Sequence, residues 1–401
     1  MRRFVLLLAC SFLPSPILAY SVLTHEAIID ISWARGIRPL IEARFPGLTQ
    51  EQLRDAQAYA YGGAIIQDMG YYPFGNHFFS DLVHYTRSGD FVLAMLQEAQ
   101  NPNEYAFSLG ALAHYAADNL GHPIAVNRTV PMVYPKLARK YGPQVTYEDD
   151  PGAHLKTEFG FDVIQVARGL YASDAYHDFI GFRVAKPVLE RGFQDTYSLP
   201  LNSLFGDLDL ALGTYRYSVS RAIPEMTKTA WAAKKEEIKS LQASATRRKF
   251  VYKLSRATYH QEWDRRYQRP GLGARFLAWL FAIFPKVGPF RALGFKIPPS
   301  AAENLFLKSL EDTGRRYREL LEDDGQGRLQ LTNENFDTGA PTHWGDYRLA
   351  DETYAKLLER FEGKPENVGP ELKANILRFY TSGGSPASEK ARAVLAALRN
   401  E

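Results

Sequence analysis

The sequence predicts an all-α protein, and three stretches carry this prediction. Residues 105–127 (YAFSLGALAHYAADNLGHPIAVN) are rich in Ala, Leu and Gly and have the pattern of one buried helix. Residues 167–242 keep helical periodicity in segments separated by Pro or Gly. Residues 301–401 alternate amphipathic helices with a polar loop at 323–346. With 401 residues, the chain has room for one large domain or two ordinary ones.

Residues 1–19 have the pattern of a signal peptide. Arg2 and Arg3 precede an apolar run, and the stretch ends in a small residue, Ala19, as signal-peptidase sites do. The only cysteine, Cys10, lies in this leader, so the mature chain cannot form disulfides. Lipidation of Cys10 is an alternative, although the apolar run before it is short. No later segment has the roughly 20 uninterrupted apolar residues of a membrane span. We therefore expect an exported protein, periplasmic or secreted, that begins at Tyr20.

The central stretch carries three strong metal-ligand types, His114, Asp118 and His122, at steps of four residues. On a helix they span roughly 80° of one face, so all three can point into a single cavity. Pro123 disfavours helical geometry at the residue before it, so we expect the helix to end at His122. A core helix whose polar groups bond to neighbours would explain one such residue. Three of them in an apolar helix favour a metal site.

Upstream, helices are expected at about 35–45 and 49–66. Asp68 follows the second helix, and an aromatic loop (YYPFGNHFF, 71–79) comes next, which is expected either to line the entrance of a site or simply to pack. His84 lies in the following element and is a candidate ligand. His77 follows a Gly-Asn pair, so we expect it in the loop, at the surface or behind the ligands.

Further candidates lie on both sides of this region. His154 and Glu158 are one helical turn apart, a common way to offer two ligands from one helix, although an exposed pair would look the same. His25 lies close to the new chain end at Tyr20, whose α-amino group has a pKa near 8 and is able to bind zinc. The His177-Asp178 dipeptide is interpreted as a helix-end pair.

The region 241–300 is basic and contains a short aromatic segment, FLAWLFAIF, at 276–284. Its Trp279, Phe281 and Phe284, flanked by positive charges, suit a segment that lies on an anionic membrane surface. A buried helix of a C-terminal subdomain and a nucleic-acid contact are the alternatives. In residues 301–401 no pattern indicates chemistry.

The candidate ligands combine His, Asp and Glu without thiolates, as zinc does in hydrolytic sites. They are too many for one tetrahedral ion and suit two or three Zn2+ ions. The full set is Tyr20, His25, Asp68, His84, His114, Asp118, His122, His154 and Glu158.

With this set the sequence resembles the zinc-dependent phospholipases C, which share a fold with the single-strand-specific fungal nucleases. The His-x3-Asp and His-x3-Glu/Asp motifs of that family are matched by His114 with Asp118 and by His154 with Glu158. Its upstream Asp and His are matched by Asp68 and His84, and the zinc-binding chain end of the nucleases by Tyr20 with His25. Two features depart from the pattern: the step to His122 is short, and Tyr20 replaces the usual Trp. The resemblance covers residues 20–167.

We expect residues 20–242 to form a helical catalytic domain of the multi-helix type that the resemblance implies. Residues 243–401, which the resemblance does not account for, are expected to form a helical C-terminal extension. By the family pattern, Asp68, His84, His114 and Asp118 hold one zinc. His122, His154 and Glu158 hold a second, and Tyr20, His25 and Asp118 hold a third.

The implied activity is phosphodiester hydrolysis by a zinc-activated water, which Asp68 orients or deprotonates. A phospholipase C acting on phospholipid at a membrane surface is the first interpretation. A single-strand nuclease of the same fold, or a catalytically silent, membrane-associated zinc-binding protein, is the alternative. No protein partner is inferred.

Overall fold

The computed structural model describes residues 22–168, 182–219, 294–381 and 383–400, and it confirms the all-α fold. The only sheet in these ranges is a short antiparallel hairpin of β1 (Glu334–Asn335) and β2 (Ala340–Pro341). Several predictions fall outside the described ranges and stay predictions: the leader, Tyr20, His177, Trp279, Phe281 and Phe284.

The chain forms one helix after another. Up to residue 168 the elements are α1 (Val22–Ser32), η1 (Trp33–Ile37), α2 (Arg38–Arg44), α3 (Gln50–Gly63), η2 (Ile66–Tyr71), α4 (His77–Tyr85), α5 (Ser88–Glu98), α6 (Pro102–Gly121), η3 (His122–Val126), α7 (Asn127–Val133), α8 (Pro135–Tyr141) and α9 (Pro151–Arg168). The later described elements are α11 (Lys186–Tyr197), η4 (Leu201–Leu204), α12 (Leu208–Tyr217), α17 (Ser300–Gly325), α18 (Arg348–Glu359), η7 (Pro365–Asn367), α19 (Pro370–Phe379) and α20 (Glu389–Asn400).

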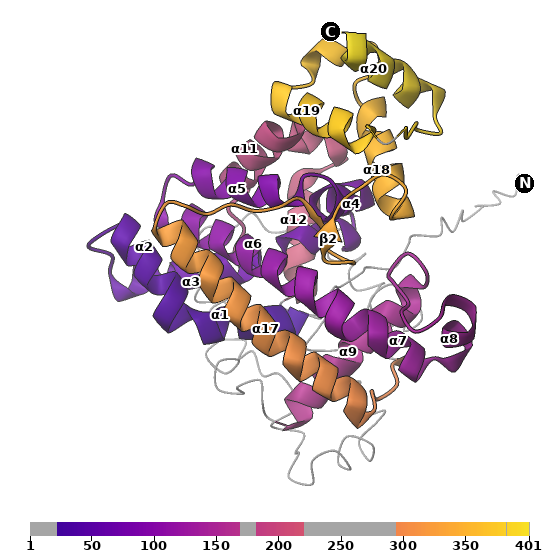
Figure 1. Ribbon diagram of the computed structural model, residues 1–401. Helices are drawn as coiled ribbons and strands as arrows, with labels where there is room; N and C mark the ends of the chain where they lie inside the picture. Colours follow the sequence, from indigo (N-terminus) through magenta and orange to yellow (C-terminus); the bar gives the residue numbers. More distant parts are fainter. Residues whose placement is uncertain (1–21, 169–181, 220–293, 382, 401) are drawn as a thin grey trace, which may run out of the picture.

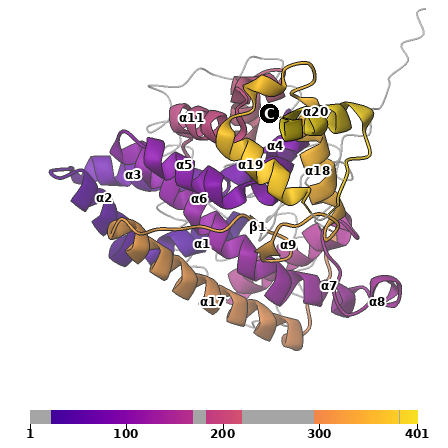
Figure 2. The same cartoon turned by 45° about the horizontal axis from the view of Figure 1, so that its top comes forward.

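Helix α6 runs through the middle of the molecule, with α17 along one side of it (Figures 1 and 2). Asn101 caps its N-terminus, because its side-chain oxygen accepts hydrogen bonds from the backbone N–H groups of Asn103 and Glu104. On another side α3 packs closely against α6. A Cβ at Gly110 would lie 2.1 Å from the carbonyl oxygen of Ala60, so glycine permits this approach.

The α-helix α6 ends at Gly121 with His122 as its C-cap, where the sequence predicted the end, but the backbone does not leave the helical conformation there. Instead α6 passes into the π turn η3, and then into α7 with helical backbone throughout. Pro123 is the second residue of this π turn, so its missing N–H is accommodated by wider winding rather than by a break. His122 therefore starts the π turn one turn beyond Asp118. A correction concerns His77, which is the first residue of α4, capped by Asn76, and is not in a loop.

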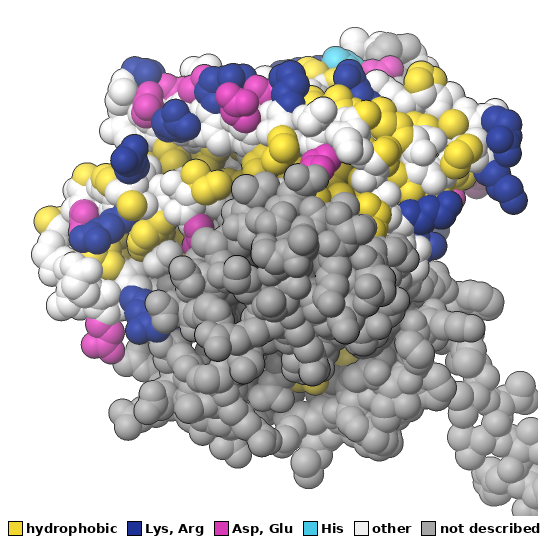
Figure 3. All heavy atoms as spheres, turned by 90° about the horizontal axis from the view of Figure 1, so that it is seen from below, with side chains coloured by type: hydrophobic (Ala, Val, Ile, Leu, Met, Phe, Trp, Pro, Cys, Tyr) yellow, Lys and Arg dark blue, Asp and Glu magenta, His cyan; other side chains and the backbone are white. Residues whose placement is uncertain are grey.

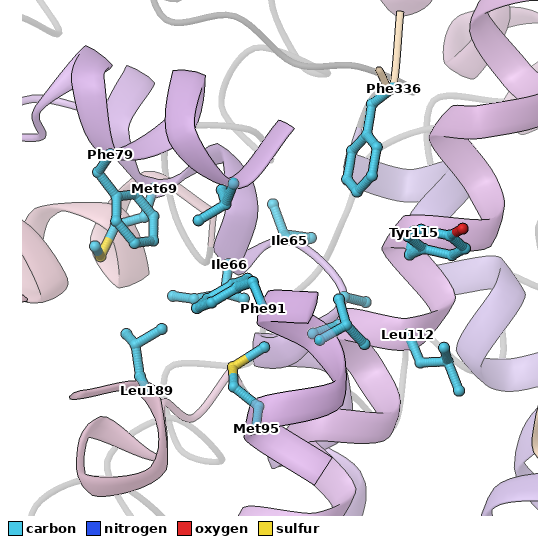
Figure 4. Close-up of a cluster of buried hydrophobic side chains, with 14 of the residues drawn as sticks. Ile65, Ile66, Met69, Phe79, Phe91, Met95, Leu112, Tyr115, Leu189 and Phe336 are labelled. Atoms are coloured by element: carbon cyan, nitrogen blue, oxygen red, sulfur yellow. The ribbon is translucent and has the colours of Figure 1, made fainter. Parts of the chain in front are cut away.

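One hydrophobic core includes residues from both the N-terminal helices and the C-terminal region. Tyr317 of α17 donates a hydrogen bond of 2.8 Å to the carbonyl oxygen of Leu109 in α6. Phe336, next to the hairpin, points toward Tyr115 of α6 (Figure 4), and their ring centroids are 5.6 Å apart. The predicted boundary at 242/243 lies outside the described residues. The described parts on its two sides nevertheless share this core.

Seen from below, the described part of one face carries a band of hydrophobic side chains with Lys and Arg at its margins (Figure 3). No binding surface is inferred from this band. Within the described ranges, no helix combines the length and apolar character needed to cross a bilayer.

Candidate metal centre

Eight of the nine predicted ligands lie within the described residues, and the fold buries all of them. Their side chains form three groups, and in each group the potential ligand atoms lie within 4.8 Å of one another. The first group is Asp68, His84 and His114; the N-terminal group is His25, His114 and Asp118; the second group is His122, His154 and Glu158.

The first group joins η2, α4 and α6. Nε2 of His84 lies 3.4 Å from Oδ1 of Asp68 and 3.6 Å from Oδ2 of Asp118. Nε2 of His114 lies 3.0 Å from Oδ2 of Asp118. Asp118 thus lies beside both histidines of the first group, where its carboxylate would help to hold a metal ion.

Backbone carbonyls fix both rings of the first group. Nδ1 of His84 lies 2.8 Å from the carbonyl oxygen of Ser80, and Nδ1 of His114 lies 2.9 Å from that of Ala64. A carbonyl oxygen only accepts, so both Nδ1 atoms carry the proton. The Nε2 lone pairs therefore face the carboxylates and are free to bind a metal.

The N-terminal group depends on α1. Nε2 of His25 lies 3.5 Å from Oδ1 of Asp118, and the His25 ring stacks on that of His114 at 4.5 Å. Asp162 of α9 holds the first turns of α1, because its carboxylate accepts hydrogen bonds from the Leu23 N–H (3.2 Å) and from the Thr24 hydroxyl (2.7 Å). This anchor places His25 at the centre of the molecule.

The second group joins η3 and α9. Nδ1 of His154 lies 2.7 Å from Oε1 of Glu158, one turn along the same helix, and Nε2 of His122 lies 3.9 Å from that oxygen. None of these atoms makes a hydrogen bond within the described chain. The π turn at His122 directs its ring toward α9.

Sequence reasoning missed one residue of this region, Asp337. It is buried, and its Oδ1 lies 3.0 Å from Nδ1 of His122 and 3.5 Å from Nε2 of His154. It stands just after β1, in the stretch that the sequence suggested was only a polar loop. Nothing in that stretch has a helical period, and a single Asp among polar residues gives no signal of its own.

The electrostatics show that this site needs positive charge. Within the described residues, the carboxylate oxygens of Asp68, Asp118 and Glu158 are buried and accept no hydrogen bond. Burial raises the pKa of Asp68, and it raises that of Glu158 well above the usual value. Burial opposes ionisation of Asp118 as well, but His114 and His84 outweigh it and hold its pKa well below the usual range. Buried carboxylates of this kind are normally paired or bound to metal, and the His/Asp/Glu donor set fits zinc.

The same carboxylates shift the pKa of His84. Burial disfavours the charged form of His84, but Asp118 and Asp68 overcome this and raise its pKa to about 10. The positive charge that the described residues themselves supply there is a proton on His84 or on His114, whose pKa is also raised because Asp118 and Asp68 outweigh burial. A divalent cation would replace it, because metal binding requires the neutral ring.

The aromatic side chains of the predicted loop lie in three different environments. Tyr72 and Phe79 are buried in the hydrophobic core and have no direct role at an entrance. Phe74 is 41% exposed. Tyr71 packs beside the first group, with its ring centroid 5.9 Å from that of His84. Only Tyr71 of these four therefore borders the site directly.

Residues 24–207 match the sequence model of a family described as zinc-dependent phospholipase C. This part of the chain belongs to that family. The family domain, as residues 24–207 are called from here on, contains all eight described candidate ligands. It does not contain Asp337. No curated protein and no solved structure matched the chain significantly.

Proposed function

We propose that the protein is a zinc-dependent phosphodiesterase of the phospholipase C type, which cleaves the glycerol–phosphate bond of a phospholipid. The observation that carries this proposal is the meeting of three buried His/carboxylate groups inside the family domain. The chain is also proposed to be exported, and to begin at Tyr20, whose free amine would complete the N-terminal group. Phospholipid is the proposed substrate, and a membrane surface the proposed partner.

Two or three zinc ions would be held as the groups indicate. Asp68, His84, His114 and Asp118 would hold one, His122, His154 and Glu158 a second, and Tyr20 with His25 and Asp118 a third. When bound, zinc lowers the pKa of a bound water to about 7 and neutralises charge on phosphoryl oxygens.

The side chains of the first group have separate tasks. Hydrogen bonds to Ser80 and Ala64 hold the rings of His84 and His114 in one tautomer, so they need no reorganisation during the reaction. Asp68 is the proposed catalytic residue: it orients the attacking water and accepts its proton. Burial supports this task, because it raises the pKa of Asp68 and makes the carboxylate a stronger base.

The choice of phospholipid rests on the family of residues 24–207 and on the basic, aromatic segment at 276–284. Trp279, Phe281 and Phe284 of that segment are proposed to enter the membrane interface. A single-strand nuclease would use the same phosphodiester chemistry, and a silent zinc-binding protein would use none. These two alternatives are outcomes of the test.

The test compares two substrates with the zinc-loaded, mature protein. Phospholipid vesicles are assayed for diacylglycerol and single-stranded DNA for acid-soluble nucleotides, each with the wild type and with Asp68→Asn. We expect diacylglycerol release that Asp68→Asn abolishes. Release of nucleotides alone would identify a nuclease instead. No turnover of either substrate by a protein with bound zinc would support the silent alternative and overturn the proposal.

A further inference from the structure

The C-terminal region reaches the metal centre through the residues around the hairpin. The Phe336 N–H donates to the carbonyl oxygen of His84 at 3.2 Å, and the Phe336 ring lies 5.1 Å from that of His84 and 6.0 Å from that of His114. The next residue, Asp337, contacts His122 and His154. A segment far outside the family domain thus lies against both groups of ligands.

The contact between Asp337 and His122 fixes a tautomer. A carboxylate oxygen only accepts hydrogen bonds, so the 3.0 Å contact with Oδ1 of Asp337 places the proton of His122 on Nδ1. The lone pair of Nε2 then faces Glu158. A carboxylate behind a metal-binding histidine also makes the ring a stronger donor to the metal.

Asp337 is itself held on every side. Its Oδ2 accepts from the backbone N–H of Tyr147 (2.8 Å) and from the Tyr347 hydroxyl (2.6 Å). Its own N–H donates to Oδ1 of Asn335 at 2.9 Å. These bonds leave Oδ1 aimed at His122 without freedom to turn away.

The same segment orients the second histidine through Asn127. Nδ2 of Asn127 donates to the carbonyl oxygen of Asp337 at 2.7 Å, which settles the orientation of the amide. Oδ1 of Asn127 therefore accepts from Nε2 of His154 at 2.8 Å, and Nδ1 of His154 faces Glu158. Asp337 thus acts on both histidines, directly on His122 and through Asn127 on His154.

We propose that Asp337 is a positioning residue of the second group, and that the C-terminal region completes the metal centre which the family domain begins. This inference rests on the zinc centre of the proposed function. Asp337 holds the two imidazoles in the tautomers that bind metal. A role limited to holding the hairpin against α6 is the competing explanation.

The variant Asp337→Asn separates the two explanations. An amide has one oxygen, and the fixed N–H of Tyr147 requires it, so the amide NH2 would face Nδ1 of His122. That moves the ring proton to Nε2, the nitrogen that should bind zinc. We expect zinc at the second group to bind about 10- to 100-fold more weakly, the usual effect of losing such a partner.

Zinc content and chelator competition measure this effect in the full-length mature protein. His122→Ala identifies the ion at stake: Asp337→Asn should lose the same single ion, and the double variant should lose no more. Tyr347→Phe is the matched control, because it removes only one of the two hydrogen bonds to Oδ2. The Tyr147 N–H and Oδ1 of Asn335 still hold Asp337 and keep its contact with His122. It should keep the wild-type zinc content.

Wild-type zinc affinity in Asp337→Asn would overturn the proposal. The proposal would also be overturned if the zinc-free Asp337→Asn protein had a lower Tm and this destabilisation accounted for the whole loss of zinc affinity. That result would indicate a role in the fold alone. A wild type that binds no zinc would instead overturn the proposed function, so the two failures are distinguishable.

A second measurement needs no variant and decides the matter if Asp337→Asn does not fold. Nitrogen NMR of the 15N-histidine-labelled, zinc-loaded wild type reports the tautomer of each ring. For His122 we expect a proton on Nδ1 and zinc on Nε2. Zinc on Nδ1 of His122 would overturn the proposal.

Discussion

The first and second groups of the candidate metal centre each combine two histidines with one carboxylate, but different parts of the chain hold their histidine rings in place. In the first group, backbone carbonyls of Ser80 and Ala64 hold the two histidines. In the second, side chains do so, Asp337 behind His122 and Asn127 behind His154. Helices of the family domain therefore suffice for the first group, whereas the second depends on a residue of the C-terminal region.

This difference shows where the centre is sensitive to substitution. A backbone carbonyl cannot be removed by a point mutation, so the first group fails only when a ligand is lost. The second group also fails when a supporting side chain changes. Substitutions in and around the two groups test this difference between them.

Loss of His114 should be the most damaging change, because this residue belongs to both the first and the N-terminal group. We expect His114→Ala to lower kcat/KM more than about 100-fold, beyond the range for supporting residues. Zinc content should fall at both groups, while the second group keeps its ion. Elemental analysis and a vesicle assay measure these effects. Near-normal turnover would refute the assignment of the first group.

Removal of zinc should lower stability strongly, because it leaves buried carboxylates without a neutralising cation. When the free zinc concentration is about 1,000 times the Kd of a site, the ion bound there adds about 4 kcal/mol to the free energy of unfolding. Thermal unfolding with and without a chelator measures the total. The chelator effect should be smaller in His122→Ala than in the wild type, by the share of one ion, and smaller still in His114→Ala. An equal effect in all three would contradict separate groups.

Gly339→Ala should disturb the second group from outside the ligands. Gly339 has a φ of 65°, and a Cβ there would lie 2.3 Å from the carbonyl oxygen of Asn119. The conformation alone costs about 1–2 kcal/mol, and the clash should push the hairpin and Asp337 away from α6. Chemical denaturation and zinc competition measure the two consequences.

Gly327→Ala is the matched control for Gly339→Ala. Gly327 has a φ of 66°, but a Cβ there meets nothing within 4 Å. It should lose stability through backbone strain alone and keep the zinc affinity of the second group. Equal zinc affinities in the two variants would count against the link between the hairpin and the second group.

Asp30 belongs to none of the three groups of candidate ligands. Asp30→Asn therefore tests the cost of burying a carboxylate alone, and we expect the smallest change in stability from it. Burial raises its pKa from 3.8 to about 6, although a hydrogen bond from Tyr61 opposes the shift. The folded state therefore holds the proton more tightly, and stability falls as pH rises from about 4 to 6. Asp30→Asn should stabilise the protein by about 1–2 kcal/mol at pH 7.

Denaturation of both proteins over a range of pH measures this difference. The gain from Asp30→Asn should disappear below about pH 3, where the wild-type carboxyl is protonated in both the folded and the unfolded state. At Asp68 the same change should destabilise the zinc-loaded protein, because that carboxylate has a cation to bind. A stabilised Asp68→Asn variant would contradict this contrast.

The sequence indicated the candidate ligands because most of them follow helical spacing. His114 and Asp118 share a face of α6, and His154 and Glu158 share a face of α9, so period alone brings each pair together. Such a period says nothing about the winding at His122, where a π turn follows the end of α6.

Support from distant segments could not be predicted in this way. Asp337 lies in an irregular stretch, and only the tertiary fold brings it to His122. The burial of Tyr72 and Phe79 was equally invisible, because an aromatic loop has the same composition at a site entrance and in a core.

The zinc content of the purified mature protein is the most direct test of whether the buried His, Asp and Glu side chains hold zinc. After dialysis against metal-free buffer, elemental analysis should give two or three zinc ions per chain. A protein that folds as described here and holds no zinc would contradict the account.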